Sequence, residues 1–246
     1  MSKDYINMKN NKIFKLNCPK CGTERVYTSY AALYTAKKNG TLCKKCAQRK
    51  IVKHTSTVEK LLEESPESYY WIGFLLADGN FKDGRIRLGL GIKDENHLLR
   101  FCKYINYFGS ISKTAIKVSM GVMHKEVVEQ IQEKFNIQEN KTLNPPKYII
   151  PNNFLGLSLI IGFIDGDGNI NKQYKRQDGL IRIKCHSSWY SILYQFSAIL
   201  NCAQPYINKQ GYVVLNIAKH SSIELLQSNI RQYTLPVLMR KWNKLC

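Results

Sequence analysis

The sequence lacks an apolar run long enough to cross a bilayer. Its longest apolar stretch, residues 154–164, covers only about half of the residues that a membrane-spanning helix needs. The first fifteen residues also lack the apolar segment of a secretory signal. These absences predict an intracellular protein, in a bacterial or phage-host cytoplasm or in an organelle, that is not secreted and not held in a membrane.

Acidic residues are scarce beside basic ones. The 246 residues include 18 Asp and Glu against 37 Lys and Arg, a formal net charge of +19. Residues 1–60 carry 14 of the basic residues and only 3 of the acidic ones. Such an excess is typical of proteins that bind a polyanion, either nucleic acid or an acidic membrane surface. The hydrophobic content of 44% is enough for one large domain beside a small module.

Four of the eight cysteines form two CxxC pairs, Cys18 with Cys21 and Cys43 with Cys46. In an intracellular protein they are metal ligands or buried thiols before they are disulfides. Four thiolates suit a closed, structural zinc site, and a redox pair or an iron–sulfur cluster are the alternatives. The Cys-Pro-x-Cys-Gly form resembles the knuckle of zinc-ribbon and treble-clef modules. We therefore expect residues 1–56 to form a small zinc-dependent DNA-binding module and its linker.

A short apolar segment occurs twice, at residues 71–79 and 160–168, and each copy closes on Asp-Gly. We expect a helix from each copy, the first capped by Ser65. Within each copy two small residues lie four apart, so they share one helical face and allow the two helices to pack closely. The small residues are Gly73 and Ala77 in the first copy and Gly162 and Gly166 in the second.

The acids Asp78 and Asp167 fall at the ends of these expected helices. A carboxylate is disfavoured there, because the helix dipole places partial negative charge at the C-terminus, and two such ends side by side repel each other. The pair therefore needs a cation. Mg²⁺ is the natural candidate, since it binds one or two carboxylates while phosphate oxygens and water complete its shell.

After each motif the sequence predicts a hairpin, a helix, a second hairpin and a further helix. Residues 85–93 and 181–186 alternate apolar and basic residues with the period of a strand, and the second turn is expected near residues 177–179. Each half thus offers a sheet with one apolar and one basic face, and a strand pair of this kind fits the DNA major groove. The expected DNA-binding residues are Arg85, Arg87, Lys113, Lys117, Ser119, Arg182, Lys184, His186, Tyr212 and Asn216.

The two motifs resemble the LAGLIDADG signature, and the layout of residues 65–246 resembles a single-chain homing endonuclease with two motifs. The resemblance implies an α+β domain over residues 57–246. Its two αββαββα halves, at about 65–147 and 148–246, would be related by a pseudo-two-fold axis through the motif helices. It also implies that the protein is a monomer.

The implied activity is hydrolysis of both strands of a long, asymmetric double-stranded DNA target with Mg²⁺ or Mn²⁺. By position, the resemblance makes Asp78 and Asp167 catalytic and places the metal at these acids with Gly79 and Gly168. Three lysines, Lys93, Lys141 and Lys241, match the peripheral catalytic positions, and Ser188 is a weaker match to the position of Lys93. The first motif has Leu76 where the second has Asp165, so Asp165 is expected to be structural.

Two other functions remain open on the sequence. A DNA-binding regulator could keep the fold and lose cleavage, although acids at both central positions argue against this. An RNA-binding maturase that assists folding of intron RNA would use the same basic faces, and the sequence does not exclude it.

Overall fold

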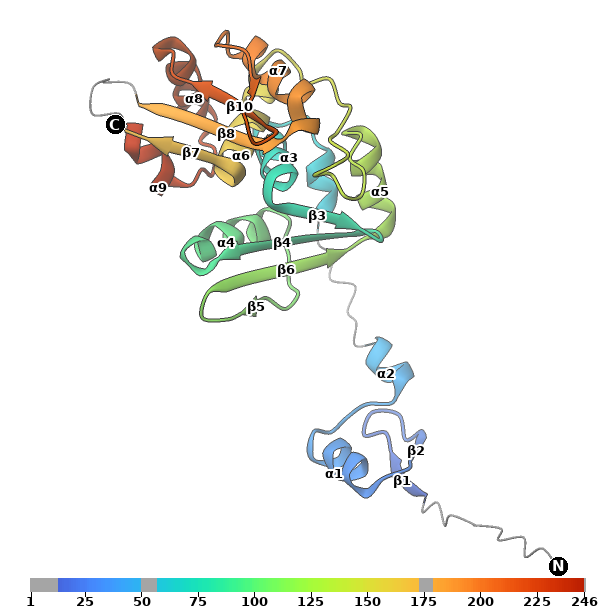
Figure 1. Cartoon of the computed structure of the whole chain (residues 1–246). Coiled ribbons are helices and arrows are strands. Elements are labelled where there is room, and N and C mark those ends of the chain that lie inside the picture. Colours follow the sequence, from blue (N-terminus) through green and yellow to red (C-terminus); the bar gives the residue numbers. More distant parts are fainter. Residues whose placement is uncertain (1–12, 50–56, 173–178, 246) are drawn as a thin grey trace, which may run out of the picture. The chain divides into compact units, whose positions relative to one another are not determined.

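The computed structural model describes residues 13–49, 57–172 and 179–245 and divides the chain into two compact units, residues 1–54 and 55–246 (Figure 1). Most of the expected linker and part of the expected turn near residue 177 lie outside the described residues.

The N-terminal unit is a small hairpin followed by two helices. Strand β1 (Phe14–Asn17) pairs antiparallel with β2 (Glu24–Tyr27), and helices α1 (Tyr30–Lys38) and α2 (Lys44–Arg49) follow. Helix α1 begins where the Ser29 side chain accepts a hydrogen bond from the backbone amide of Ala32, an ordinary N-cap. So few elements cannot bury an apolar core, and the cysteines form the centre of this unit.

The C-terminal unit repeats one order of elements. The first half contains α3 (Pro66–Asp78), β3 (Gly79–Lys82), β4 (Arg85–Gly91), α4 (Glu95–Tyr104), β5 (Ser112–Lys113), β6 (Lys117–Met123) and α5 (Lys125–Lys134), after a short 3₁₀ helix η1 (Val58–Leu62). The second half contains α6 (Phe154–Asp167), β7 (Gly168–Asn171), β8 (Leu180–His186), α7 (Tyr190–Ile199), β9 (Tyr206–Ile207), β10 (Tyr212–Ile217), α8 (His220–Tyr233) and the short α9 (Met239–Trp242). The expected α+β duplication is confirmed.

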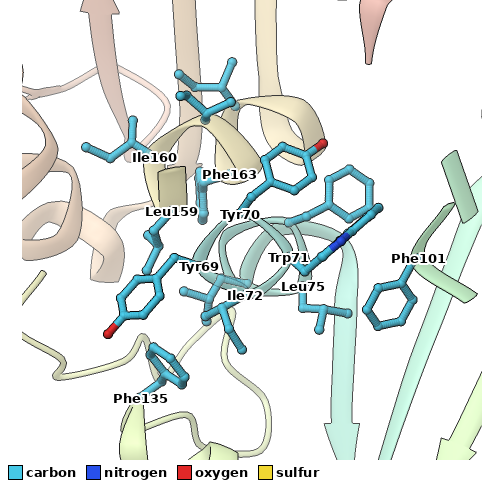
Figure 2. Packing of buried hydrophobic residues seen from close by; sticks show 14 of the residues in the cluster. Tyr69, Tyr70, Trp71, Ile72, Leu75, Phe101, Phe135, Leu159, Ile160 and Phe163 are labelled. Carbon is cyan, nitrogen blue, oxygen red and sulfur yellow. The ribbon is translucent and has the colours of Figure 1, made fainter. Parts of the chain in front are cut away.

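Helices α3 and α6 pack against each other at the centre of this unit (Figure 2). Ser65 accepts a hydrogen bond from the Ser68 amide, as predicted, and Asn153 caps α6 in the same way. A Cβ added at Gly73 would lie 1.9 Å from the Leu159 carbonyl oxygen, and one at Gly162 would lie 1.9 Å from that of Tyr70. Only glycine therefore allows the two backbones to approach this closely. In the described part of the chain, no helix is long and apolar enough to span a bilayer.

Each half carries a four-stranded antiparallel sheet, in the order β3-β4-β6-β5 or β7-β8-β10-β9. Alternate residues of β4 and β8 are buried, so one face of each sheet packs on the core and the other faces solvent. The apolar side chains of both sheets and of the helices join in one hydrophobic cluster. The basic residues of the sequence pattern remain on the solvent side.

One detail of the predicted elements was wrong, and the spacing between the halves differs from element to element. Strand β4 ends at Gly91 rather than at Lys93, and residues 92–94 form a 3₁₀ turn, η2 (Ile92–Asp94), that leads into α4. The spacing between the halves is also not constant: the motifs lie 89 residues apart (79 to 168), whereas the paired strands lie 95 apart (88 to 183). The connection between β7 and β8 is longer than the connection between β3 and β4, and a comparison of the motifs alone cannot reveal this difference.

Candidate functional site

The two motif acids lie at the adjacent ends of the central helices. Asp78 and Asp167 are the last residues of α3 and α6, and both are exposed to solvent. A Cβ added at Gly166 would lie 2.2 Å from the Ala77 Cβ and 3.5 Å from the Asp78 nitrogen, so these ends touch each other. The packing of small residues therefore brings the acids from sequence-distant motifs to one place.

The glycines that follow the acids are required by space and not by an unusual backbone conformation. Gly79 and Gly168 both have φ of −78°, which any residue can adopt. A Cβ at either position would lie within 2.6 Å of the carbonyl oxygen four residues earlier, Leu75 or Ile164. The chain turns directly from helix into strand β3 or β7 at these points, and this sharp turn fixes where each acid points.

Two lysines cap the helix ends that carry the acids. The Lys141 ammonium donates to the Leu76 and Ala77 carbonyls at 2.6 and 2.8 Å. Lys241 donates to the equivalent carbonyls of Asp165 and Gly166, at 2.6 and 3.1 Å, and to two more, those of Ile164 and Gly168. A cation at a helix C-terminus satisfies carbonyls that have no helical partner and offsets the dipole.

Both lysines act on both acids, and each acid is influenced more by the lysine of the other half. The charge of Lys241 lowers the pKa of Asp78 more than the charge of Lys141 does, whereas Lys141 has the larger effect on the pKa of Asp167. We call Asp78 with Lys241 the Lys241 centre, and Asp167 with Lys141 the Lys141 centre. Each centre thus takes its acid from one half and its lysine from the other.

Partial desolvation makes both acids harder to ionise, and the charge of Asp167 adds to this effect at Asp78. Desolvation, followed by the negative charge of Asp167, raises the pKa of Asp78 to about 6, and desolvation also raises the pKa of Asp167. The same desolvation lowers the pKa of Lys141 and of Lys241, although the nearby acids oppose this shift. The site therefore holds a carboxylate pair that a further cation would stabilise.

The donor set fits a hard divalent cation. Two exposed carboxylates at adjacent helix ends are the ligands that Mg²⁺ prefers, and solvent access leaves room for water or phosphate oxygens. The expected carbonyl ligands are less alike than the sequence implies, because the Gly168 carbonyl accepts a hydrogen bond from Lys241 at 2.7 Å. Metal binding at Gly79 and Gly168 stays a prediction.

Asp165 lies in the protein interior, away from solvent. Its carboxylate accepts hydrogen bonds from the Tyr70 hydroxyl, the Leu238 amide and the Trp242 indole, at 2.7, 2.9 and 2.8 Å. Complete burial raises the pKa of Asp165 to about 6 despite these donors. Tyr70 also lies 3.0 Å from His97 Nε2, and burial lowers the pKa of His97 to about 4. These contacts agree with the structural role that the first motif's leucine suggested.

The other two expected peripheral residues lie at equivalent places in the halves. Lys93 is exposed in the 3₁₀ turn η2, and Ser188 occupies the matching turn η3 (Ser187–Trp189). The Ser188 hydroxyl donates to the Thr142 carbonyl at 3.0 Å, directly beside Lys141. The structure thus brings Ser188 next to the Lys141 centre, while the catalytic role of Lys93 stays a prediction.

The expected DNA-binding residues follow the solvent faces of the two sheets. Arg87, Lys113, Lys117, Arg182, Lys184, His186 and Tyr212 are exposed, and Arg85, Ser119 and Asn216 are half-buried. Sequence reasoning missed two further polar residues on these faces, Asn80 and Asn169. Asn80 pairs with Arg87 across β3 and β4, and Asn169 pairs with Arg182 in the same register of β7 and β8. The signal was available, since each asparagine follows its motif glycine.

A cavity of about 460 Å³ opens beside the Lys141 centre. Its lining combines Asp167 and Lys141 with residues of the second sheet, including Lys184, His186 and Tyr212. The Lys184 ammonium lies 4.3 Å from the centre of the Tyr212 ring, a cation–π contact that holds the lysine in place. The cavity therefore joins an acidic metal ligand candidate to basic and aromatic groups of the sheet face.

The four N-terminal cysteines form a second candidate site. The sulfur atoms of Cys18, Cys21, Cys43 and Cys46 all lie within 4.8 Å of one another, and Cys21 and Cys43 are 3.6 Å apart. Tetrahedral zinc sets its thiolates about 3.8 Å apart, so the cluster can bind this ion. The Cys43 amide is the main cause that lowers the pKa of Cys18 to about 6, and Cys21 is the main cause that raises the pKa of Cys46 to about 12. A bound cation would relieve this conflict between neighbouring thiolates.

Solved structures share this arrangement of helices and sheets. The LAGLIDADG homing endonuclease I-GzeII, in complex with its DNA target, is 17% identical, with a TM-score of 0.55 over 74% of this chain and 89% of that chain. The meganuclease I-SmaMI, bound to uncleaveable DNA, is 14% identical, with a TM-score of 0.53 over 74% and 88%. This chain has the LAGLIDADG homing endonuclease fold.

A third structure of the LAGLIDADG fold, the homing endonuclease I-LtrWI bound to target DNA, is 15% identical, with a TM-score of 0.50 over 73% of this chain and 86% of that chain. No protein-family model matches the sequence, and no curated protein gives a significant match. The LAGLIDADG fold is therefore evident in the tertiary structure, at sequence identities of 14 to 17%.

Proposed function

We propose that this protein is a site-specific endonuclease that hydrolyses both strands of a long, asymmetric DNA duplex with Mg²⁺ or Mn²⁺. The observation that carries the proposal is the pair of exposed acids, Asp78 and Asp167, on touching helix ends at the start of two basic sheets. The solved proteins I-GzeII and I-LtrWI, which have the same fold, are bound to their DNA targets, and this supports a DNA duplex as the partner.

The chain's own groups have distinct roles in this reaction. Asp78 and Asp167 would hold the divalent cation, which when bound supplies a Lewis acid that lowers the pKa of a water molecule. Lys141 and Lys241 place a positive charge beside each acid, where negative charge grows on the phosphate in the transition state. Their hydrogen bonds to backbone carbonyls hold these charges in position before the substrate arrives.

The two sheet faces would read the duplex. Arg87 and Arg182 occupy matching registers, each opposite an asparagine, and both side-chain types make paired hydrogen bonds to base edges in the major groove. The rest of the faces differ between the halves, with Gly91 where the second half has His186. A target read by unlike halves is asymmetric.

The first experiment separates binding from cleavage. Duplexes that bind the protein in EDTA are selected from a library with a randomised segment, and Mg²⁺ is then added. We expect the selected duplex to be cut on both strands. Binding without cutting would identify a regulator, and selective binding of structured RNA over every duplex would favour the maturase.

The second experiment assigns the acids. Asp78→Asn and Asp167→Asn each remove one charged ligand, and we expect cutting to be lost while affinity for the selected duplex changes by a few fold. Asp83→Asn is the matched control, because Asp83 is an exposed acid in the turn after β3 and its loss changes the net charge equally. Equal loss of cutting in all three variants would contradict the assignment.

We also propose that residues 1–56 form a zinc-dependent module that adds DNA affinity to the endonuclease domain at 57–246. The compact cysteine cluster supports the site, and the charge of the N-terminal quarter supports the partner. Cys18→Ser or Cys43→Ser should release zinc, measured with a chromogenic chelator, and weaken binding without loss of cutting at saturating protein. Cys202→Ser, outside the cluster, is the control. Unchanged affinity after zinc release would contradict the module's role.

A further inference from the structure

The buried carboxylate of Asp165 holds both ends of the chain segment that carries Lys241. Its Oδ2 accepts from the Leu238 amide, directly before α9, and its Oδ1 accepts from the Trp242 indole at the end of α9. Asp165 is 1% exposed, so these hydrogen bonds do not compete with water. Lys241 lies between the two contacts, and its own amide donates to the Leu238 carbonyl at 2.8 Å.

The segment is fixed from a second side by an ion pair. The Arg240 guanidinium contacts both carboxylate oxygens of Asp94 at 2.5 Å, and Asp94 belongs to the turn before α4 in the first half. With these two anchors in place, the Lys241 side chain reaches toward the end of α6. It is 8% exposed there and donates to four carbonyls.

The first half holds its lysine by different means. Leu76 stands where the second half has Asp165, and a leucine side chain cannot accept hydrogen bonds from a chain segment. Lys141 follows Asn140, which has a left-handed backbone with φ of 55°, and among the described residues it donates to two carbonyls. Lys141 is also more exposed than Lys241. The segment with Lys141 is itself held at the Thr142 carbonyl, by the neutral donors Ser188 and Trp189. The segment with Lys241 is held through the charged groups Asp165 and Arg240, which make stronger hydrogen bonds. The two lysine caps are therefore equivalent in place but unequal in restraint.

We infer that Asp165 is a positioning residue for Lys241, and that it makes the Lys241 centre more rigid than the Lys141 centre, so the two strands of a duplex are cut at unequal rates. The inference rests on the proposed nuclease function. A charge that is already held in its working position needs no rearrangement in the transition state. Loss of that restraint should therefore slow the cleavage of one DNA strand more than that of the other.

The test uses the full-length protein and a selected duplex labelled differently on each strand. Under single-turnover conditions at saturating protein, Asp165→Asn should slow the cut of one strand by roughly tenfold to a hundredfold and leave the other within about threefold. The affected strand should be the one that Lys241→Met slows. Equal slowing of both strands would overturn the inference.

A matched pair of variants separates positioning from general damage to the buried network. Trp242→Phe and Tyr70→Phe each remove one hydrogen-bond donor from the same carboxylate, but only Trp242 belongs to the segment with Lys241. We expect Trp242→Phe to reproduce the strand-selective loss. Tyr70→Phe should lower thermal stability and preserve the ratio of the two rates, and the reverse pattern would contradict the inference.

A double-mutant cycle tests whether Asp165 acts through the lysine. If it does, Asp165→Asn adds little further loss of cleavage to a protein that already carries Lys241→Met. Independent, multiplicative losses on the affected strand would mean that Asp165 acts in another way and would overturn the inference.

Hydrogen exchange reads the same restraint without any cleavage. The Lys241 and Trp242 amides both donate to the Leu238 carbonyl, whereas the Leu143 and Asn144 amides near Lys141 donate to Asn140. Asp165→Asn should expose the first pair to faster exchange and leave the second pair unchanged. A protein that never cuts DNA would refute the nuclease proposal, and unchanged exchange at Lys241 and Trp242 would refute the positioning role by itself.

Discussion

Lys141 and Lys241 cap equivalent helix ends, yet the two halves place them with different chemistry. In the second half a buried carboxylate and an ion pair fix the segment that carries Lys241, whereas in the first half a turn with a left-handed asparagine precedes Lys141. The helix interface that brings them together is nearly symmetric, since Gly73 and Gly162 approach the opposite backbone at the same distance. The two halves thus share the helix interface that positions the site, and they differ in how its charged groups are restrained.

The sheets show a second difference of this kind. In the second half Lys184 of β8 lies over the ring of Tyr212 in β10, whereas in the first half Lys117 of β6 lies over Gly89 of β4. By register Lys117 corresponds to Tyr212, and Gly89 corresponds to Lys184. Each face thus has an ammonium group at this pair of positions, but the opposite strand supplies it. Position of charge, rather than residue identity, is what the halves share.

The largest expected effect is on the lysines themselves. Lys141→Met and Lys241→Met should each slow strand cleavage by about a hundredfold to a thousandfold, the scale of losing one transition-state donor. Because the centres pair across the halves, the two variants should slow different strands. Single-turnover cleavage rates on a strand-labelled duplex measure this difference. Slower cleavage of the same strand in both variants would contradict the assignment of one centre to each strand.

The helix interface provides the next largest effect. Gly73→Ala and Gly162→Ala each force a methyl group against a backbone carbonyl, so the free energy of unfolding should fall by about 3 kcal/mol or more in both. Gly121→Ala is the control, since its added Cβ would meet neighbours only at 3.7 Å and beyond. Denaturant unfolding measures the three variants. If Gly73→Ala and Gly162→Ala lowered the free energy of unfolding by clearly different amounts, the two sides of the interface would be energetically unequal in spite of their equal distances.

A smaller effect concerns pH, because α4 has the buried His97 where α7 has Ile192. The unfolded chain binds a proton at His97 near pH 6.5, whereas the folded chain does so only near pH 4. The free energy of unfolding should therefore keep its full value above pH 6.5 and fall as the pH drops toward 4, by up to about 3 kcal/mol. His97→Ile makes the halves alike and should flatten this part of the profile. An unchanged profile in the variant would assign the loss to other groups.

The smallest expected effect is on affinity for DNA. Lys117→Met and Lys184→Met each remove one exposed cation from a sheet face, so each should weaken binding by a few fold and reduce the slope of log affinity against log salt by about one. Salt titration of binding to the selected duplex measures both slopes. Equal reductions in slope would support the same role for Lys117 of β6 and Lys184 of β8. A reduced slope in only one variant would mean that only one half contacts DNA through this lysine.

Much of the fold could be predicted because its signals are local. The Ser65 cap, the small residues of the motifs and the alternation of β8 each act within a few residues, and the structure confirms all three. Strand β4 was extended too far, since the alternation continues through Ile92 although the backbone turns at that point. Asn80 and Asn169 were overlooked because polar residues after a glycine are common, and only the register places them opposite arginines.

The sequence by itself determined which residues meet, because glycine and alanine at fixed spacing leave two helices one close way to pack and carry Asp78 and Asp167 to their ends. It also determined the cysteine cluster, whose paired spacing suits one metal ion. Only the tertiary structure decided which lysine faces which acid and how firmly each is held. Those relations depend on contacts between residues far apart in the sequence, such as Asp165 with Leu238 and Trp242, and no local pattern encodes them.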